Sequence, residues 1–337
     1  MPSMKKPFAA CALLLLSIGS APAEGGVIFG DVGLAGGFRW DVAPRTINGN
    51  ERSLDGGLRY SLQGGSYQAY RDLFSWSAVP SVAEFTTAIE DAFGAWTAAD
   101  PVTGLTTDIS FVADFATPVV GTGMGGLNTN GAEIDLFGSI DADSWNPGDP
   151  GRRGESFFNA VGGTVTLTSG VAGYAAGAIY GADITLNSNP GAVYALDGFR
   201  RLLTHEIGHA LGLGDVEFGG PNGFIDDNYN PGNVAATLTN SWALLVNPLN
   251  PSASPLGLFT VTGGDPGTST PGVNILMEST GLGIAPANPV TNLFPLTNDD
   301  YGTRQFLYPE ILQTPEPVTL TLLGLGVAGG LARRRRP

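Results

Sequence analysis

Residues 202–215 read LLTHEIGHALGLGD, and this stretch sets the expectations for the rest of the chain. His205 and His209 are four residues apart, a spacing that places both side chains on one face of a helix. The chain contains 2 histidines in all, and both are in this stretch. Gly212 follows the last apolar helical position and is suited to end the helix. The pattern therefore predicts a helix that carries a metal site.

The residue types favour zinc as the metal. Imidazole nitrogen binds Zn²⁺ at about 2.0–2.1 Å, and protein zinc sites take four ligands in a tetrahedron. The 1 cysteine, Cys11, lies in the N-terminal segment assigned below to a signal peptide, so the third protein ligand should be a carboxylate. Asp215 is the first choice, because a positive φ at Gly212 can turn the chain back beneath the ion. The alternatives are four later acids: Glu217, Asp226, Asp227 and Glu278.

Glu206 is the candidate catalytic residue. It lies next to a histidine but about 100° further round the helix, so it need not bind the metal. Three protein ligands leave one zinc position open for water, and zinc lowers the pKa of that water towards about 7. A carboxylate beside the open position can accept the proton. We therefore expect Glu206 to act as a general base.

The complete pattern, H-E-x-x-H-x-x-G-x-x-D from His205 to Asp215, resembles the metzincin zinc endopeptidases and is similar to their snapalysin type. Residues 274–280, NILMEST, look like the family's Met-turn, in which Met277 would form a hydrophobic floor below the zinc without binding it. Residues 297–309 look like the final helix of matrixin-type catalytic domains. The resemblance implies a secreted endopeptidase that acts on protein or peptide substrates.

The resemblance also implies the fold class. It is α+β, with a twisted mixed β-sheet, a backing helix, an active-site helix and a C-terminal helix. Two other interpretations remain open at this point. The chain could be a non-catalytic zinc-binding protein of the cell envelope or biofilm, although such a protein would not need Glu206. It could also use a gluzincin arrangement, in which Glu278 completes the ligand set.

Patterns elsewhere predict the remaining elements. Ser81 and Glu84 form a capping-box pattern before a helix, whose apolar stripe consists of Val82, Phe85, Ile89, Phe93 and Trp96. Short apolar or alternating runs predict strands at 58–62, 109–112, 134–137, 164–168 and 184–186. The motif helix is expected over 198–211 with Asp197 as its N-cap, and a final helix over 299–307.

Both ends of the chain are typical of targeting segments. Residues 1–23 combine two lysines, a short apolar run and an A-x-A site, which predicts a secretory signal peptide. Residues 313–337 contain a Pro-Glu-Pro triplet, an apolar run and four arginines, and resemble the PEP-CTERM sorting signal of Gram-negative bacteria. That resemblance implies export to the cell envelope and processing by an exosortase. One catalytic domain over 24–312 is expected between them, with a Gly/Pro/Asn-rich insertion at about 216–272.

The charge of the chain bears on its partners. The formal net charge is −15, which argues against nucleic acid as a partner. Two acidic loops offer oxygen ligands of the kind that Ca²⁺ prefers, although neither has the spacing of an EF-hand. Their oxygen donors are Asp141, Asp143, Asn146 and Asp149 in the first loop, and Asn222, Asp226, Asp227 and Asn228 in the second. Calcium is therefore a second candidate ion beside zinc.

Overall fold

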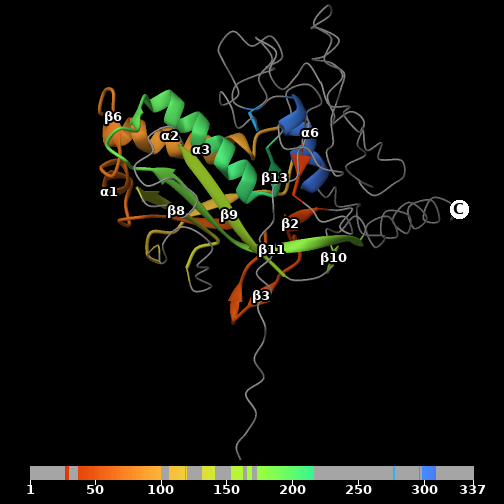
Figure 1. Cartoon of the computed structure of the whole chain (residues 1–337). Coiled ribbons are helices and arrows are strands. Elements are labelled where there is room, and N and C mark those ends of the chain that lie inside the picture. Colours follow the sequence, from red (N-terminus) through yellow and green to blue (C-terminus); the bar gives the residue numbers. More distant parts are fainter. Residues whose placement is uncertain are drawn as a thin grey trace, which may run out of the picture.

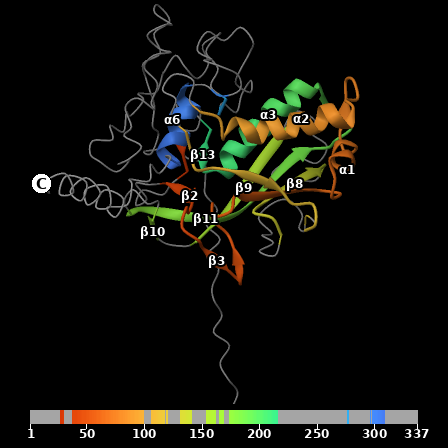
Figure 2. The ribbon, with the colours of Figure 1, turned by 180° about the vertical axis from the view of Figure 1, so that it is seen from behind.

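The computed structural model describes residues 27–29, 37–99, 106–117, 119, 131–140, 153–161, 165–168, 173–215, 276–277, 296 and 298–308. Within them, a mixed 7-stranded sheet carries helices α2 (Val82–Ala95) and α3 (Leu196–Ala210) on one face. Helix α6 (Asn298–Leu307) lies near the C-terminal end of α3, as both ribbon views show (Figures 1 and 2). This mixture of a parallel-strand sheet with few helices is compatible with the predicted α+β class.

The central part of the sheet is parallel. Its strands are β7 (Phe111–Ala113), β5 (Leu58–Leu62), β8 (Ile134–Ser139) and β11 (Gly173–Asn187), in that spatial order. Strand β9 (Gly154–Ala160) pairs antiparallel with β11, in a register that joins Ser156 to Ile184. The first part of β11 also pairs with β10 (Val165–Thr168) and β2 (Phe38–Trp40). Strand β9 runs below α3 and packs against this helix (Figure 1).

Short elements complete the framework. They are β1 (Val27–Ile28), which pairs with β13 (Leu213–Gly214); β6 (Ser75–Trp76), which pairs with β12 (Val193–Tyr194); the hairpin of β3 (Thr46–Ile47) and β4 (Asn50–Glu51); and helix α1 (Tyr67–Arg71). Positive φ angles at Asn48 and Gly49 form the hairpin turn. None of the helices in the described part of the chain combines the length and apolar character needed to cross a bilayer.

The core lies between the sheet and helices α2 and α3. Apolar residues alternate along the strands towards the helices, and Tyr60 of β5 stacks on Phe93 of α2 with ring centroids 4.1 Å apart. The capping box at Ser81 and Glu84 is confirmed, with both hydrogen bonds present. One member of the predicted stripe differs, because Val82 in the first turn of α2 is 36% exposed.

The start of the motif helix differs from the prediction. Helix α3 begins at Leu196, and its N-cap is Ala195, which makes no side-chain capping bond. The prediction of Asp197 as N-cap is therefore wrong. Asp197 lies in the first helical turn, where its carboxylate faces the positive end of the helix dipole and pairs with Arg200 at 2.5 Å. An acidic residue is thus favourable in the first turn as well as at the N-cap.

Several strand boundaries also differ from the predictions. The strand expected at 109–112 is found at Phe111–Ala113, although Ile109 is buried just before it. The run predicted at 184–186 is the end of the 15-residue strand β11, whose small residues hid its length. Strand β10 begins at Val165 and helix α6 at Asn298, each one residue from the predicted start. Residues 1–23, 216–272 and 313–337 lie outside the described residues, as do both candidate calcium loops.

The face of the sheet opposite the helices is polar yet buried. Glu133 is held there by Arg59, with 2.7 Å between Nη2 and Oε1, and by Arg52 at 3.5 Å. Asp135 of β8 and Asp183 of β11 occupy paired positions in neighbouring parallel strands. Burial, followed by the charge of Asp183, raises the pKa of Asp135 to about 7. The folded state therefore favours a protonated Asp135.

We expect Asp135→Asn to be more stable than wild type above about pH 8, by at most about 4 kcal/mol in the free energy of unfolding. A carboxyl group with a raised folded-state pKa stabilises the fold fully below its ordinary pKa of 3.8, and that contribution is lost as the pH rises through about 7. Urea unfolding of both proteins between about pH 4 and pH 8 measures how the difference between their unfolding free energies changes with pH. Asp55→Asn, at an exposed position, controls for the loss of one negative charge. Stability differences that do not change with pH would contradict the prediction.

Candidate metal centre

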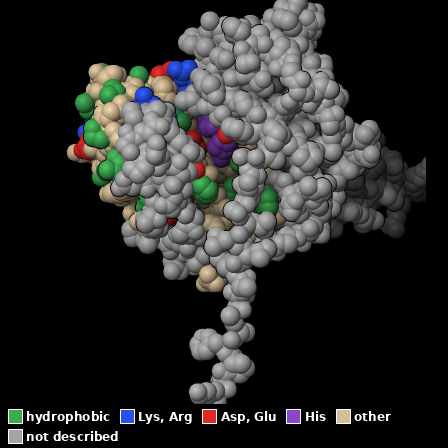
Figure 3. Space-filling view, in the orientation of Figure 1, with side chains coloured by type: hydrophobic (Ala, Val, Ile, Leu, Met, Phe, Trp, Pro, Cys, Tyr) green, Lys and Arg blue, Asp and Glu red, His purple; other side chains and the backbone are tan. Residues whose placement is uncertain are grey.

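Helix α3 presents the two histidines from a tightly packed position. Its buried side includes Phe199, Leu203 and Ile207, and the indole Nε1 of Trp96, the C-cap of α2, donates to the carbonyl of Thr204 at 2.8 Å. His205 and His209 are themselves buried, and their rings lie 4.5 Å apart between centroids. In the space-filling view histidine side-chain atoms are visible from outside the molecule (Figure 3). The packing of α3 therefore holds the two imidazoles in place.

The C-terminal end of α3 is held by residues from distant parts of the chain. The indole Nε1 of Trp40 in β2 donates to the carbonyl of Ala210 at 2.9 Å. The hydroxyl of Tyr308, at the end of α6, donates to the carbonyl of Leu211 at 2.6 Å and accepts from the backbone N–H of Trp40 at 3.0 Å. These bonds satisfy carbonyls that a helix end leaves without partners. No local sequence pattern predicted this pairing.

Gly212 reverses the chain after the helix. Its φ is +97°, and a Cβ at this position would overlap the carbonyl oxygen of Phe38. The next two residues form β13, which pairs antiparallel with β1, and the N–H of Phe29 donates to the carbonyl of Gly212 at 2.8 Å. This strand pairing brings Asp215 back below the histidines. Sequence analysis missed β1, because two residues carry no periodic signal.

We expect Gly212→Ala to lower both stability and metal affinity. The substitution forces an L side chain into a left-handed conformation and into the backbone of Phe38, at a cost of at least about 1–3 kcal/mol. Gly56→Ala is the matched control, because Gly56 has a φ of +81° with no atom within 4 Å of its Cβ position. Both variants carry the strain of a positive φ, but only Gly212→Ala also carries the overlap with Phe38. Thermal unfolding and zinc titration of the two variants therefore measure the effect of the overlap. Equal losses in both variants would contradict the role given to the close approach.

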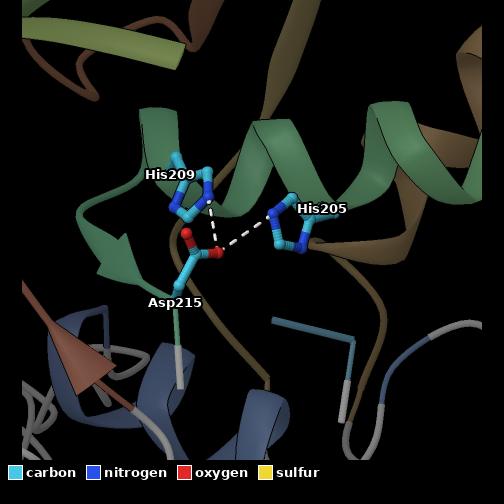
Figure 4. Close-up of side chains that lie close together, drawn as sticks. All are labelled: His205, His209 and Asp215. Carbon is cyan, nitrogen blue, oxygen red and sulfur yellow. Dashed lines mark ion pairs between the residues drawn. The ribbon is translucent and has the colours of Figure 1, made fainter. Parts of the chain in front are cut away.

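The structure brings His205, His209 and Asp215 together around one point (Figure 4). The Oδ1 atom of Asp215 lies 3.2 Å from Nε2 of His205 and 3.1 Å from Nε2 of His209. The candidate ligand atoms all lie within 4.8 Å of one another. In the part of the chain that the structure describes, this is the one group of three or more such residues. The alternative ligands Glu217, Asp226, Asp227 and Glu278 lie outside the described residues.

Backbone carbonyls set the orientation of both imidazoles. Nδ1 of His205 lies 2.7 Å from the carbonyl oxygen of Leu276, and Nδ1 of His209 lies 2.8 Å from that of Leu213. A carbonyl can only accept, so each Nδ1 carries the hydrogen. In the neutral imidazole the Nε2 lone pair then points at Asp215. With both imidazoles neutral, three electron-pair donors therefore converge on one point.

The pKa shifts of His209 and Asp215 show that the cluster favours an added positive charge. Burial by itself would lower the pKa of His209, but the charge and hydrogen bond of Asp215, with a contribution from Glu206, raise it to about 9. In the opposite direction, the histidines hold the pKa of the Asp215 carboxyl well below its usual range, although burial opposes this. The cluster therefore binds a cation in preference to staying neutral, whether that cation is a proton or a metal ion.

The donor set fits a zinc ion. Ligand atoms about 2.0–2.1 Å from the centre of a tetrahedron are about 3.3 Å apart. The separations of 3.1 and 3.2 Å between Asp215 and the two histidines are close to that value. Two imidazole nitrogens and one carboxylate oxygen also leave a fourth position open, as catalytic zinc sites require. The role of these residues as ligands stays a prediction.

Met277 lies against the backbone of the motif helix. Its side chain is buried, and a Cβ at Gly208 would overlap its Sδ atom and approach Cζ2 of Trp96 to 2.8 Å. Gly208 lies between the two histidines on α3, so Met277 packs at the level of the site. The residue before it, Leu276, supplies the carbonyl that orients His205. The backbone of this short segment thus contacts His205, and its side chain contacts Gly208 of the same helix.

The carboxylate of Glu206 contacts strand β9. Glu206 is 3% exposed, and its Oε2 accepts a hydrogen bond from the hydroxyl of Ser156 at 2.7 Å. Its charge also acts on His209, whose pKa it helps to raise. Ser156 did not figure in the sequence analysis, because a serine in a short strand carries no signal of its own.

Comparison with known proteins adds one finding about the C-terminus. Residues 313–336 match the family model of the PEP-CTERM protein-sorting motif. The sorting signal predicted from the Pro-Glu-Pro triplet is thereby confirmed, and with it export, association with the envelope of a Gram-negative bacterium and an exosortase as partner. No curated protein matches the chain.

Proposed function

We propose that this chain is an exported zinc-dependent endopeptidase. One observation carries the proposal: two Nε2 atoms and one carboxylate oxygen converge, each imidazole being oriented by a backbone carbonyl. Such an arrangement is stable only around a cation, and second-sphere carbonyls of this kind are typical of metal-binding histidines. A carboxylate directly after the first histidine then supplies the base that hydrolysis needs.

The proposed roles follow from the positions of the residues. His205, His209 and Asp215 would hold the ion, and a bound zinc ion supplies a polarised water and a Lewis acid for the substrate carbonyl. Glu206 accepts a proton on its carboxylate and later returns it to the amine of the leaving peptide. Met277 and Trp96 pack below Gly208 and keep the floor of the site apolar. Asp215 adds negative charge to the ligand set, which should make the zinc a weaker Lewis acid than three histidines would.

The framework around the site supports a metzincin type. A mixed sheet is backed by α2, the motif lies on α3, and α6 returns to the end of that helix through Tyr308. The contact of Met277 with Gly208 of the motif helix supports a Met-turn role. The C-terminal sorting motif supports an extracytoplasmic place of action, so the substrates we propose are proteins or peptides at the cell envelope or outside it.

A degradation assay tests the proposal. Purified mature chain should digest casein or gelatin, lose that activity with a zinc chelator and regain it when zinc is added back. Bound zinc should approach one ion per chain. Zinc binding without peptide hydrolysis would contradict the endopeptidase and indicate a non-catalytic envelope protein. Activity that survives complete removal of zinc would contradict the metal centre itself.

A further inference from the structure

Strand β9 contacts the Glu206 carboxylate from two sides. Ser156 and Gly154 are two residues apart on this strand, so they lie on the same face. The hydroxyl of Ser156 is 2.7 Å from Oε2 of Glu206. A Cβ on Gly154 would overlap Oε1 and approach Cδ to 2.9 Å. One face of β9 therefore receives the whole carboxylate.

The hydroxyl of Ser156 has two possible acceptors and one hydrogen. It lies 3.0 Å from the backbone carbonyl of Glu206 and 2.7 Å from its Oε2. The shorter contact is to a carboxylate, and hydrogen bonds with one ionised partner are about twice as strong as neutral ones. The hydrogen consequently goes to Oε2. That assignment leaves Oε1 on the Gly154 side of the carboxylate.

We infer that Ser156 is a positioning residue for Glu206, and that Gly154 leaves the space its carboxylate needs. Ser156 does not touch the reacting atoms and acts through Glu206. A carboxylate without this bond can rotate about its terminal torsions, which are broad and weakly defined. Because the position of a catalytic group controls its rate contribution, a bond that fixes Oε2 also fixes the rest of the carboxylate. The inference rests on the proposed function.

The experiment compares three variants of the zinc-loaded mature chain. Ser156→Ala should lower kcat by about tenfold to a hundredfold while KM stays within about twofold. Ser156→Thr keeps the hydroxyl and should recover most of kcat. Ser61→Ala is the matched control, because the hydroxyl of Ser61 in β5 is also bound to a backbone carbonyl, that of Thr117 at 2.8 Å, but lies on the far face of the sheet. This control should keep kcat at the wild-type value.

A second readout does not depend on turnover. The infrared difference spectrum between Ser156→Ala and wild type should show a shifted carboxylate stretching band, which Ser61→Ala should lack. Gly154→Ala should shift the same band, because the new methyl group displaces the carboxylate. Zinc content and melting temperature should be unchanged in Ser156→Ala.

The outcomes separate this inference from the proposed function. An active wild type with full kcat in Ser156→Ala would overturn only the role of Ser156, as would a Ser156→Thr variant no better than Ser156→Ala. If Ser156→Ala lowers kcat but also lowers the zinc content or the melting temperature, the inference would be overturned as well. A purely structural role of Ser156 explains that result. A zinc-loaded wild type without peptidase activity would overturn the proposed function and the role of Ser156 with it.

Discussion

Glu206→Gln is expected to lower kcat by about 10²–10⁴-fold, the usual contribution of a general base, while zinc content stays at the wild-type level. The amide has nearly the shape of the carboxylate and can still accept a hydrogen bond from Ser156 through its oxygen. It cannot accept the proton of the water. KM should change little, because no ligand of the metal is altered. The loss therefore falls on the chemical step.

The measurement is steady-state hydrolysis of a quenched fluorescent peptide, with zinc determined on the same samples. Glu84→Gln serves as the matched control, since Glu84 is also on a helix but only caps the exposed start of α2. That variant should keep full activity. If the activity of Glu206→Gln stayed within tenfold of wild type, the Glu206 carboxylate would not be the general base, whatever the zinc content.

Asp215→Ala is expected to weaken zinc affinity by at least about a hundredfold. The substitution removes a carboxylate oxygen that lies within 3.2 Å of both Nε2 atoms. Loss even of an outer partner of a metal ligand typically costs about 10–100-fold in affinity, and loss of a ligand costs more. Peptidase activity should fall in parallel at limiting zinc. Saturating zinc should restore it only in part, because the ion would lack a protein ligand.

Competition with a fluorescent chelator measures this affinity. Asp197→Ala is the control, because Asp197 lies on the same helix but forms surface ion pairs with Arg200 and Arg201. Its zinc affinity should equal that of wild type. Unchanged zinc affinity in Asp215→Ala would indicate that one of the later acids is the third ligand. In a gluzincin arrangement that residue would be Glu278.

Much of the motif helix could be predicted from sequence, because its determinants are local. The spacing of His205 and His209 fixes their common face, and a glycine at 212 marks where the helix ends. The capping box at Ser81 was predictable for the same reason. The start of α3 was not, since Asp197 has the chemistry of an N-cap but is also favourable in the first helical turn, where it lies. Local chemistry alone does not weigh that competition.

Contacts between distant residues could not be predicted. Trp40 and Tyr308 reach the end of α3 from elements 170 and 97 residues away in sequence. Phe29 bonds to Gly212 from near the start of the chain. Each contact depends on how strands and helices pack, and no periodicity or motif records it. The same holds for Ser156, whose position against Glu206 follows from the antiparallel pairing of β9 with β11.

The sequence by itself determined the chemistry that is available: two histidines on one helical face, a carboxylate beside them, no cysteine outside the N-terminal segment, and a sorting signal at the C-terminus. The tertiary structure decided how that chemistry is arranged. It brought Asp215 next to the two histidines by pairing β13 with β1, and it oriented the imidazoles through Leu276 and Leu213. The physical reason is that residue types and helical spacing are local properties. Convergence of side chains on one point depends on turns and strand pairs that only the packed chain can fix.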